Sequence, residues 1–234
     1  MKKHILASLL ICIAAFAADL TSPKIALPLN EGDFQVMPKF AKLYNTQLMS
    51  WVDGPGGKAL YLDNKLGEPK HATITIPLPE EIKECKPFTI SLQVKTPANI
   101  KRNRQYEIIR VTNGKKPGLR FVMTWGRFRM DISEDGTNVK SFSAATGTFP
   151  QVESDKWYHL GLVFDGKNIN FYRDGVLFYS QEAKYKVSPK ASVLQLFSTS
   201  SSGTCYYYEG AVTNFKYYAE ALTAEEMVKL ATMQ

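Results

Sequence analysis

The segment from Trp157 to Ser180, WYHLGLVFDGKNINFYRDGVLFYS, contains three apolar-rich runs separated by Asp165-Gly166 and by Asp174-Gly175. Asp-Gly between alternating runs is typical of tight hairpin turns, because such turns need positive φ, which glycine adopts without strain. The segment therefore predicts a three-stranded antiparallel meander. A chain that contains this meander must build a sheet around it, so an all-β fold is the first hypothesis.

Further short runs rich in aromatic and β-branched residues are bounded by residues that favour turns. These runs span 71–76, 88–95, 106–111, 119–125, 128–133 and 139–143. From Leu119 to Trp125 the apolar residues alternate, as they do on one face of a strand, and the pattern resumes at Phe128 after a break at Gly126. Runs at this spacing indicate an antiparallel sandwich or barrel.

The C-terminus carries a helix signal. Thr223 and Glu226 have the spacing of a capping box, in which the hydroxyl accepts from the backbone and the carboxylate reaches back to it. Leu222 and Met227 occupy the positions of a hydrophobic staple. A short amphipathic helix packed against the sandwich is therefore expected after Thr223.

Four segments follow one another in a recognisable order. They are KALYLDN at 58–64, PFTISLQV at 87–94, WYHL at 157–160 with the two Asp-Gly turns, and GAVTNF at 210–215 followed by ALTAEE at 221–226. Together they resemble the motifs of laminin-G-like, or concanavalin A-like, jelly-roll domains of secreted and surface proteins. The resemblance implies an all-β, two-sheet antiparallel jelly-roll sandwich with a short C-terminal helix.

Calcium binding is a feature that the resemblance raises. Many relatives carry an acidic pair where this chain has Thr213-Asn214, and a glycine where it has Asn64. Asp63 and Asn64 are candidate oxygen ligands, with Asp53 and Asn214 as further ones, only if the fold gathers them. The alternative is that these residues stabilise turns.

The N-terminal residues have the pattern of an export signal. Met-Lys-Lys-His precedes an apolar run from Ile5 that ends in the small-residue pattern Ala15-Phe16-Ala17, and this run is too short to span a bilayer. We expect a signal peptide at 1–17, a single laminin-G-like domain at 18–234, and a secreted, periplasmic or cell-surface location. No second run long enough for a transmembrane segment is found. The alternative is an N-terminal buried helix or membrane anchor.

Removal of the signal would take Cys12 and leave Cys85 and Cys205. In an oxidising compartment these two cysteines are expected to form one disulfide. Two buried free thiols are the alternative.

Charge is concentrated in one part of the chain. The formal net charge is +7, and residues 95–130 hold ten basic residues against one acid, Glu107. Alternation places Arg120, Arg127 and Arg129 on the strand face opposite the apolar side chains. Guanidinium groups grip sulfates, uronates or phosphates in pairs of hydrogen bonds, so these arginines are candidates for binding an anionic glycan. A solvated basic surface explains the pattern equally well.

Aromatic side chains suggest a second recognition element. Trp125, Tyr206 and Tyr208 are candidates for stacking on sugar rings, provided that they are exposed. Packing within and between sheets is the competing explanation.

Catalytic patterns are weak. The chain has no E-x-D-x-E run of the kind that places glycosidase carboxylates on one strand face, and its Glu pairs fall in expected turns or caps. His159 fits a packed, hydrogen-bonded ring better than a general base. No motif for reading nucleic acid accompanies the basic residues. The favoured hypothesis is a secreted, noncatalytic module that recognises a carbohydrate or cell-surface ligand. A carbohydrate-active enzyme and a structural or adhesive protein-interaction domain are the alternatives.

Overall fold

The structure is a computed structural model. It describes residues 20–65, 70–102, 104–112, 117–135, 139–142, 151–197 and 207–233. The expected signal peptide, Tyr206 and Cys205 lie outside these residues.

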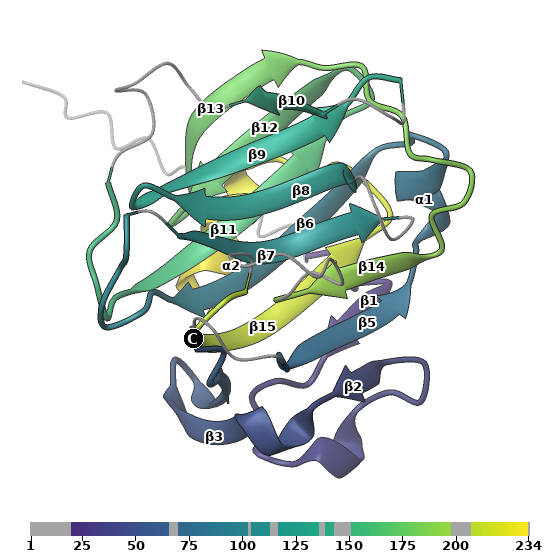
Figure 1. The fold of residues 1–234 in the computed structure, drawn as a ribbon. Helices are drawn as coiled ribbons and strands as arrows, with labels where there is room; N and C mark the ends of the chain where they lie inside the picture. The colour runs from purple at the N-terminus through teal and green to yellow at the C-terminus, as the bar shows by residue number, and fades with distance from the viewer. Residues whose placement is uncertain are drawn as a thin grey trace, which may run out of the picture.

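The described strands form two antiparallel sheets (Figure 1). In space, sheet A runs β13 (Val176–Glu182), β12 (Asn168–Arg173), β11 (Trp157–Phe164), β6 (Phe88–Lys95), β15 (Gly210–Tyr218), β4 (Gly57–Leu62), β3 (Met49–Gly54), with β1 (Ile25–Leu27) pairing to β15. Sheet B runs β10 (Val139–Phe142), β9 (Arg127–Ser133), β8 (Pro117–Thr124), β7 (Gln105–Thr112), β14 (Val193–Leu196), β5 (Thr73–Pro77), β2 (Lys42–Tyr44). The all-β, two-sheet prediction is confirmed.

The predicted meander is β11, β12 and β13, which pair in sequence. At its first turn, the Asp165 carboxylate accepts from the backbone N–H groups of Lys167 and Asn168, at 2.8 and 2.6 Å. At its second turn, Asp174 and Gly175 both have positive φ, at 52° and 78°. At both turns the glycine has positive φ, as the sequence indicates. Asp165 bonds the local backbone, whereas Asp174 Oδ1 accepts from the His159 N–H of β11 at 2.9 Å.

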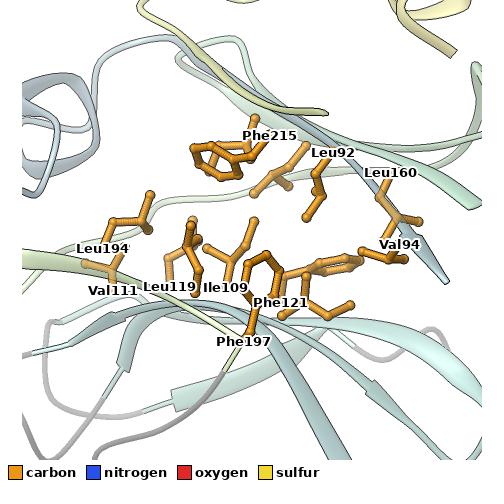
Figure 2. Packing of buried hydrophobic residues seen from close by; sticks show 14 of the residues in the cluster. Leu92, Val94, Ile109, Val111, Leu119, Phe121, Leu160, Leu194, Phe197 and Phe215 are labelled. Carbon is orange, nitrogen blue, oxygen red and sulfur yellow. The ribbon is translucent and has the colours of Figure 1, made fainter. Parts of the chain in front are cut away.

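The main core lies between the two sheets. In Figure 2, Leu92, Leu160 and Phe215 from sheet A face Ile109 and Phe121 from sheet B. Alternate residues of each strand supply this core, so the remaining ones point away from the partner sheet. Polar residues such as Ser91, Gln93 and Arg120 lie on the outer faces.

Helices are few among the described residues. The α2 helix (Ala224–Thr232) lies against the outer face of sheet A, and α1 (Glu80–Lys83) follows β5; two 3₁₀ turns span Phe34–Val36 and Thr46–Leu48. Thr223 Oγ1 accepts from the Glu226 N–H and Glu226 Oε2 accepts from the Thr223 N–H, which confirms the capping box. None of the described helices combines the length and apolar character of a membrane span.

A second, smaller core lies under α2. Met227 and Leu230 pack on the sheet A residues Val163, Tyr172 and Tyr218. Gly161 makes this contact possible, because a Cβ at that position would overlap the Met227 methyl group. The helix thereby covers one part of the outer face of sheet A and leaves the neighbouring polar part open.

Candidate functional site

The predicted arginine face lies on the outside of sheet B, where Arg120 and Arg129 are both bonded to Asp131. Register places Arg120 directly opposite Asp131, whose side chain is buried. Arg120 donates from Nε to Asp131 Oδ2 at 2.8 Å, and Arg129 donates from Nη2 to the same oxygen at 3.0 Å. A ligand anion at Arg120 or Arg129 would compete with this internal ion pair, because bonded guanidinium groups offer few free donors.

Glu107 and Arg110 form a second buried pair on this face, with Arg110 Nη1 3.2 Å from Glu107 Oε1. Burial raises the pKa of Glu107 to about 7, although Arg110 and Arg120 act in the opposite direction. The count of residues 95–130 omits Asp131, so the positive charge of this layer is smaller than that count suggests. Anion binding by Arg120, Arg127 and Arg129 stays a prediction.

The raised pKa of Glu107 predicts a pH dependence of stability. Since the folded protein holds this proton more tightly than the unfolded chain, Glu107 makes the free energy of unfolding fall as pH rises from about 4.5 to about 7. His71 and His159 act in the opposite direction, because burial lowers both of their pKa values to about 4. Urea unfolding of wild type and Glu107→Gln across this range isolates the glutamate. We expect stability to rise more with pH in the variant, and parallel profiles would contradict the assignment.

Trp125 occupies the hairpin turn between β8 and β9. Strand pairing ends at Thr124 and resumes at Arg127, leaving Trp125 and Gly126 as the two turn residues, with φ of 55° and 67°. Alternation along β8 predicted that Trp125 shares the core face, but the strand ends one residue earlier and its side chain is 63% exposed. A bulky residue at positive φ is unfavourable, so this turn places an exposed indole at a conformational cost.

Tyr208 does not share this exposure. Tyr208 is fully buried, and its hydroxyl donates to the Lys95 carbonyl at 2.7 Å. It is therefore unable to stack on a sugar, and its selection as a stacking residue was wrong. Tyr206 lies outside the described residues. The neighbouring Tyr207, Tyr217 and Tyr218 are also buried, so packing explains these three tyrosines and Tyr208.

The calcium candidates are not gathered into one site. Asn64 is buried; its Nδ2 donates to the Ala72 and Tyr208 carbonyls, and its Oδ1 accepts from the Ala72 N–H. Its selection as a ligand was therefore wrong, since backbone groups already occupy both ends of the amide. Asp63 pairs with Lys65, and Asp53 with Lys58. Over the described ranges, no group of three or more His, Cys, Asp and Glu residues is arranged to hold a metal.

Among the described residues Cys85 has no disulfide partner, and its Sγ lies 3.1 Å from the Tyr185 carbonyl oxygen. Burial raises the pKa of this thiol. The expected bridge to Cys205 stays a prediction, and alkylation of both thiols without prior reduction would contradict it.

A feature that sequence reasoning missed is a row of polar side chains across the outer face of sheet A. Register places Gln93 between His159 and Thr213, and Ser91 between Gly161 and Lys216. Four of these residues line a cavity of about 200 Å³: Ser91, Gln93, His159 and Lys216. The other lining residues are Asn30, Gly56, Asn214, Leu230 and Met233. His159 is buried and bonds Ser91 Oγ through Nε2 at 2.9 Å, which confirms the prediction of a packed ring.

A bulge in β15 shapes this cavity. Val212 and Phe215 both point into the main core although they are three residues apart, and the pairing with β6 shifts register between Thr213 and Lys216. Asn214 is the residue with positive φ, at 53°, and its Nδ2 donates to Gln93 Oε1 at 2.7 Å. The extra residue turns Asn214 toward the outer face of sheet A, as bulges commonly do beside binding sites.

A laminin G family model, described as the concanavalin A-like lectin/glucanases superfamily, matches residues 69–227, more than half of the chain. The protein belongs to this superfamily. The match includes the motifs at 87–94, 157–160, 210–215 and 221–226, whereas the motif at 58–64 lies before it. No curated protein matches the sequence.

Solved structures show the same laminin G-like fold. The receptor-binding domain of botulinum neurotoxin type G aligns with a TM-score of 0.64 at 16% identity, over 92% of this chain and 52% of that chain. The binding domain of Paraclostridial mosquitocidal protein 1 aligns with a TM-score of 0.62 at 15% identity, over 88% of this chain and 51% of that chain. The binding domain of botulinum neurotoxin DC in complex with SialylT aligns with a TM-score of 0.64 at 10% identity, over 89% of this chain and 52% of that chain. This chain spans about half the length of each.

Proposed function

We propose that this protein is a secreted, noncatalytic binding module that recognises a carbohydrate or cell-surface ligand, with anionic glycans favoured, and that Trp125 is central to the contact. The observation that carries the proposal is the exposed indole held at positive φ in the β8–β9 turn. Natural proteins retain such strained, exposed aromatic residues where ligand contact compensates for their cost. Export rests on the pattern of residues 1–17, and N-terminal sequencing of exported protein tests it.

The segment around Ile100 lies beside this turn. Ile100 Cγ2 is 4.0 Å from the position that a Cβ on Gly126 would take, and the exposed residues Lys101 and Arg102 follow Ile100 in the chain. On the other side, the Val152 N–H donates to the Gly126 carbonyl at 2.9 Å. An aromatic ring among cationic groups suits a sugar that carries negative charge.

Acidic residues near the turn are occupied. Glu153 pairs with Lys156 at 2.5 Å, and Asp155 pairs with Lys95 at 2.7 Å. No ion pair is found for Lys101 or Arg102 within the described part of the chain. The exposed charges in the segments next to the turn are thus mainly basic, in keeping with an anionic partner.

Other carriers of this fold support recognition over turnover. The structural neighbours include a neurotoxin receptor-binding domain, a neurotoxin binding domain in complex with SialylT, and botulinum neurotoxin type C, whose cell entry depends on interaction with two ganglioside molecules. These properties belong to those proteins; for the present chain they favour a glycan as the first ligand to test. A glycan array with and without added calcium identifies the ligand class, and a ligand found there is then measured by calorimetry.

Trp125→Asn separates binding from folding. Asparagine is a preferred residue of two-residue hairpin turns with positive φ, so we expect the free energy of unfolding to rise by about 0.5 kcal/mol. An interface aromatic residue commonly contributes about 2 kcal/mol, so affinity for the array ligand should fall about 30-fold. Urea unfolding and calorimetry measure the two effects.

The matched control for Trp125→Asn is Leu177→Asn, which removes another exposed apolar side chain, from β13 in sheet A. It should leave affinity unchanged. A Trp125→Asn protein that binds as tightly as wild type would exclude the turn from the contact surface. Turnover of a polysaccharide by the pure protein, or a negative array with a specific protein partner, would overturn the glycan-binding proposal itself.

A further inference from the structure

We propose that the cavity on the outer face of sheet A is a separate binding site for one sugar ring that carries a single negative charge. Its carboxylate or sulfate would contact Lys216, and its hydroxyl groups would contact the amides of Gln93 and Asn214. The site lies beside α2 and is built from β6, β11 and β15, whereas Trp125 belongs to sheet B. The inference therefore does not depend on the Trp125 surface.

The charge of the cavity indicates the charge of the ligand. Lys216 is the one charged side chain among the residues that line it, and no ion pair is found for its ammonium group among the described residues. His159 contributes no charge at neutral pH, because burial, and secondarily Lys216, lowers its pKa to about 4. A half-buried, unpaired ammonium group is matched by one anionic group and not by several.

The remaining polar groups are suited to hydroxyls. Gln93 Oε1 accepts from Asn214 Nδ2. The side-chain Nε2 of Gln93 is left as a donor, and the side-chain Oδ1 of Asn214 is left as an acceptor. His159 Nδ1 is buried and has no hydrogen-bond partner within the described residues. The free groups of Gln93 and Asn214 can therefore donate to and accept from sugar hydroxyls.

Size and shape limit the ligand to about one ring. The cavity volume of about 200 Å³ is below the roughly 300–1,000 Å³ of sites for drug-sized molecules. Leu230 and Met233 of the α2 region supply an apolar wall opposite the polar row, and Met233 is half exposed at the rim. A pyranose has this two-sided character, with one C–H face and a ring of hydroxyls.

The backbone holds these groups in place. Asn214 sits at positive φ in a bulge of a central strand, and its neighbours Val212 and Phe215 are fixed in the main core. Asparagine tolerates this conformation better than most residues, but glycine tolerates it without strain. Asn214→Gly therefore removes the amide from the cavity while preserving the bulge, which makes it a sharper test than a change to a larger residue.

The experiment is a two-dimensional NMR titration of the isotope-labelled protein with glucuronate, glucose 6-sulfate and glucose. We expect glucuronate or glucose 6-sulfate to shift the backbone amide signals of Ser91, Gln93, His159 and Lys216 at millimolar concentration, and glucose to leave them in place. Preference between the two anions distinguishes a uronate site from a sulfate site. An absence of shifts at these residues with both anions, or equal shifts with glucose, would overturn the proposal.

Variants then connect the shifts to the cavity. Lys216→Met keeps the length of the side chain and removes its charge, so affinity for the anionic sugar should fall about 10- to 100-fold. Asn214→Gly should reduce it about fivefold without loss of stability. Lys190→Met, at an exposed lysine outside the cavity, and Trp125→Asn are the controls and should bind the sugar normally. Unchanged affinity in both Lys216→Met and Asn214→Gly would exclude the site.

Discussion

Gly210→Ala is expected to lower the free energy of unfolding by about 3 kcal/mol or more. Gly210 begins β15 with φ of 144°, and a Cβ there would overlap the backbone carbonyl oxygen of Lys95 in the neighbouring β6. It would also lie 3.1 Å from Tyr208 Cε1, on a buried ring that has no room to move. Backbone strain of about 1–3 kcal/mol and overpacking of similar size add at this position.

Gly166→Ala is the matched control for this prediction. Gly166 also has positive φ, at 95°, but a Cβ there would meet only Pro87 Cγ, at 3.6 Å. The control therefore measures the cost of the backbone conformation alone, about 1 kcal/mol. Chemical unfolding of both variants gives the difference. Equal destabilisation would show that the approach of β15 to β6 is looser than the structure indicates.

The consequence of Gly210→Ala extends to the cavity of sheet A. The same two strands supply Gln93, Asn214 and Lys216, and their register is set where Ala211 pairs with Lys95. A displaced start of β15 would move the bulge relative to β6. Loss of sugar binding in a Gly210→Ala protein that remains folded is thus expected, although Gly210 does not line the cavity.

Local sequence signals predicted the elements of this fold well. Asp165-Gly166 and Asp174-Gly175 marked turns whose hydrogen bonds and φ values follow directly from those residue types. Thr223 and Glu226 predicted the start of α2 for the same reason. Each of these signals depends on residues within four positions of one another. The pairing of β14 with β5 and β7 depends on contacts far apart in the chain, and no local pattern indicated it.

The candidate sites were harder to predict because they depend on neighbours across strands. Counting charges up to Met130 left out Asp131, the next residue, which lies opposite Arg120. Two arginines that appeared free are bonded to it. Charge counts along the chain therefore overestimate the number of cations available to a ligand on a sheet face.

The cavity on sheet A was missed for a related reason. Ser91 and Gln93 alternate with core residues in β6 and show only that one face of this strand is polar. Their meeting with His159 and Lys216 requires the pairing of three strands. One signal was present in the sequence: Val212 and Phe215 are apolar residues three apart in a strand, and this spacing indicates a bulge when both are buried.

Arg104→Leu is expected to destabilise the protein by about 3 kcal/mol. The Arg104 side chain is 2% exposed; it donates to Glu209 Oε2 at 2.7 Å and to the Asn64 carbonyl at 2.5 Å, and it lies 4.7 Å from the centre of the Tyr106 ring. It thereby joins the start of β7 to the segments that follow β4 and precede β15. Leucine preserves much of the buried apolar contact. It leaves the Asn64 carbonyl oxygen and the Glu209 carboxylate without their donor, and loss of one partner of a buried pair is strongly destabilising.

Thermal unfolding measures this loss as a fall in Tm of about 9 °C for a domain of this size. Arg102→Leu is the matched control, since Arg102 is exposed two residues away, and its Tm should change by less than about 2 °C. Glu209→Gln keeps an acceptor for Arg104 and removes only the charge, so its fall in Tm should lie between those of Arg104→Leu and Arg102→Leu. If Arg104→Leu and Arg102→Leu melt together, the buried guanidinium does not hold these segments. Asn64 Nδ2 donates to the Ala72 and Tyr208 carbonyls. In that case the Asn64 side chain, and not Arg104, would join the segment after β4 to the segment before β15.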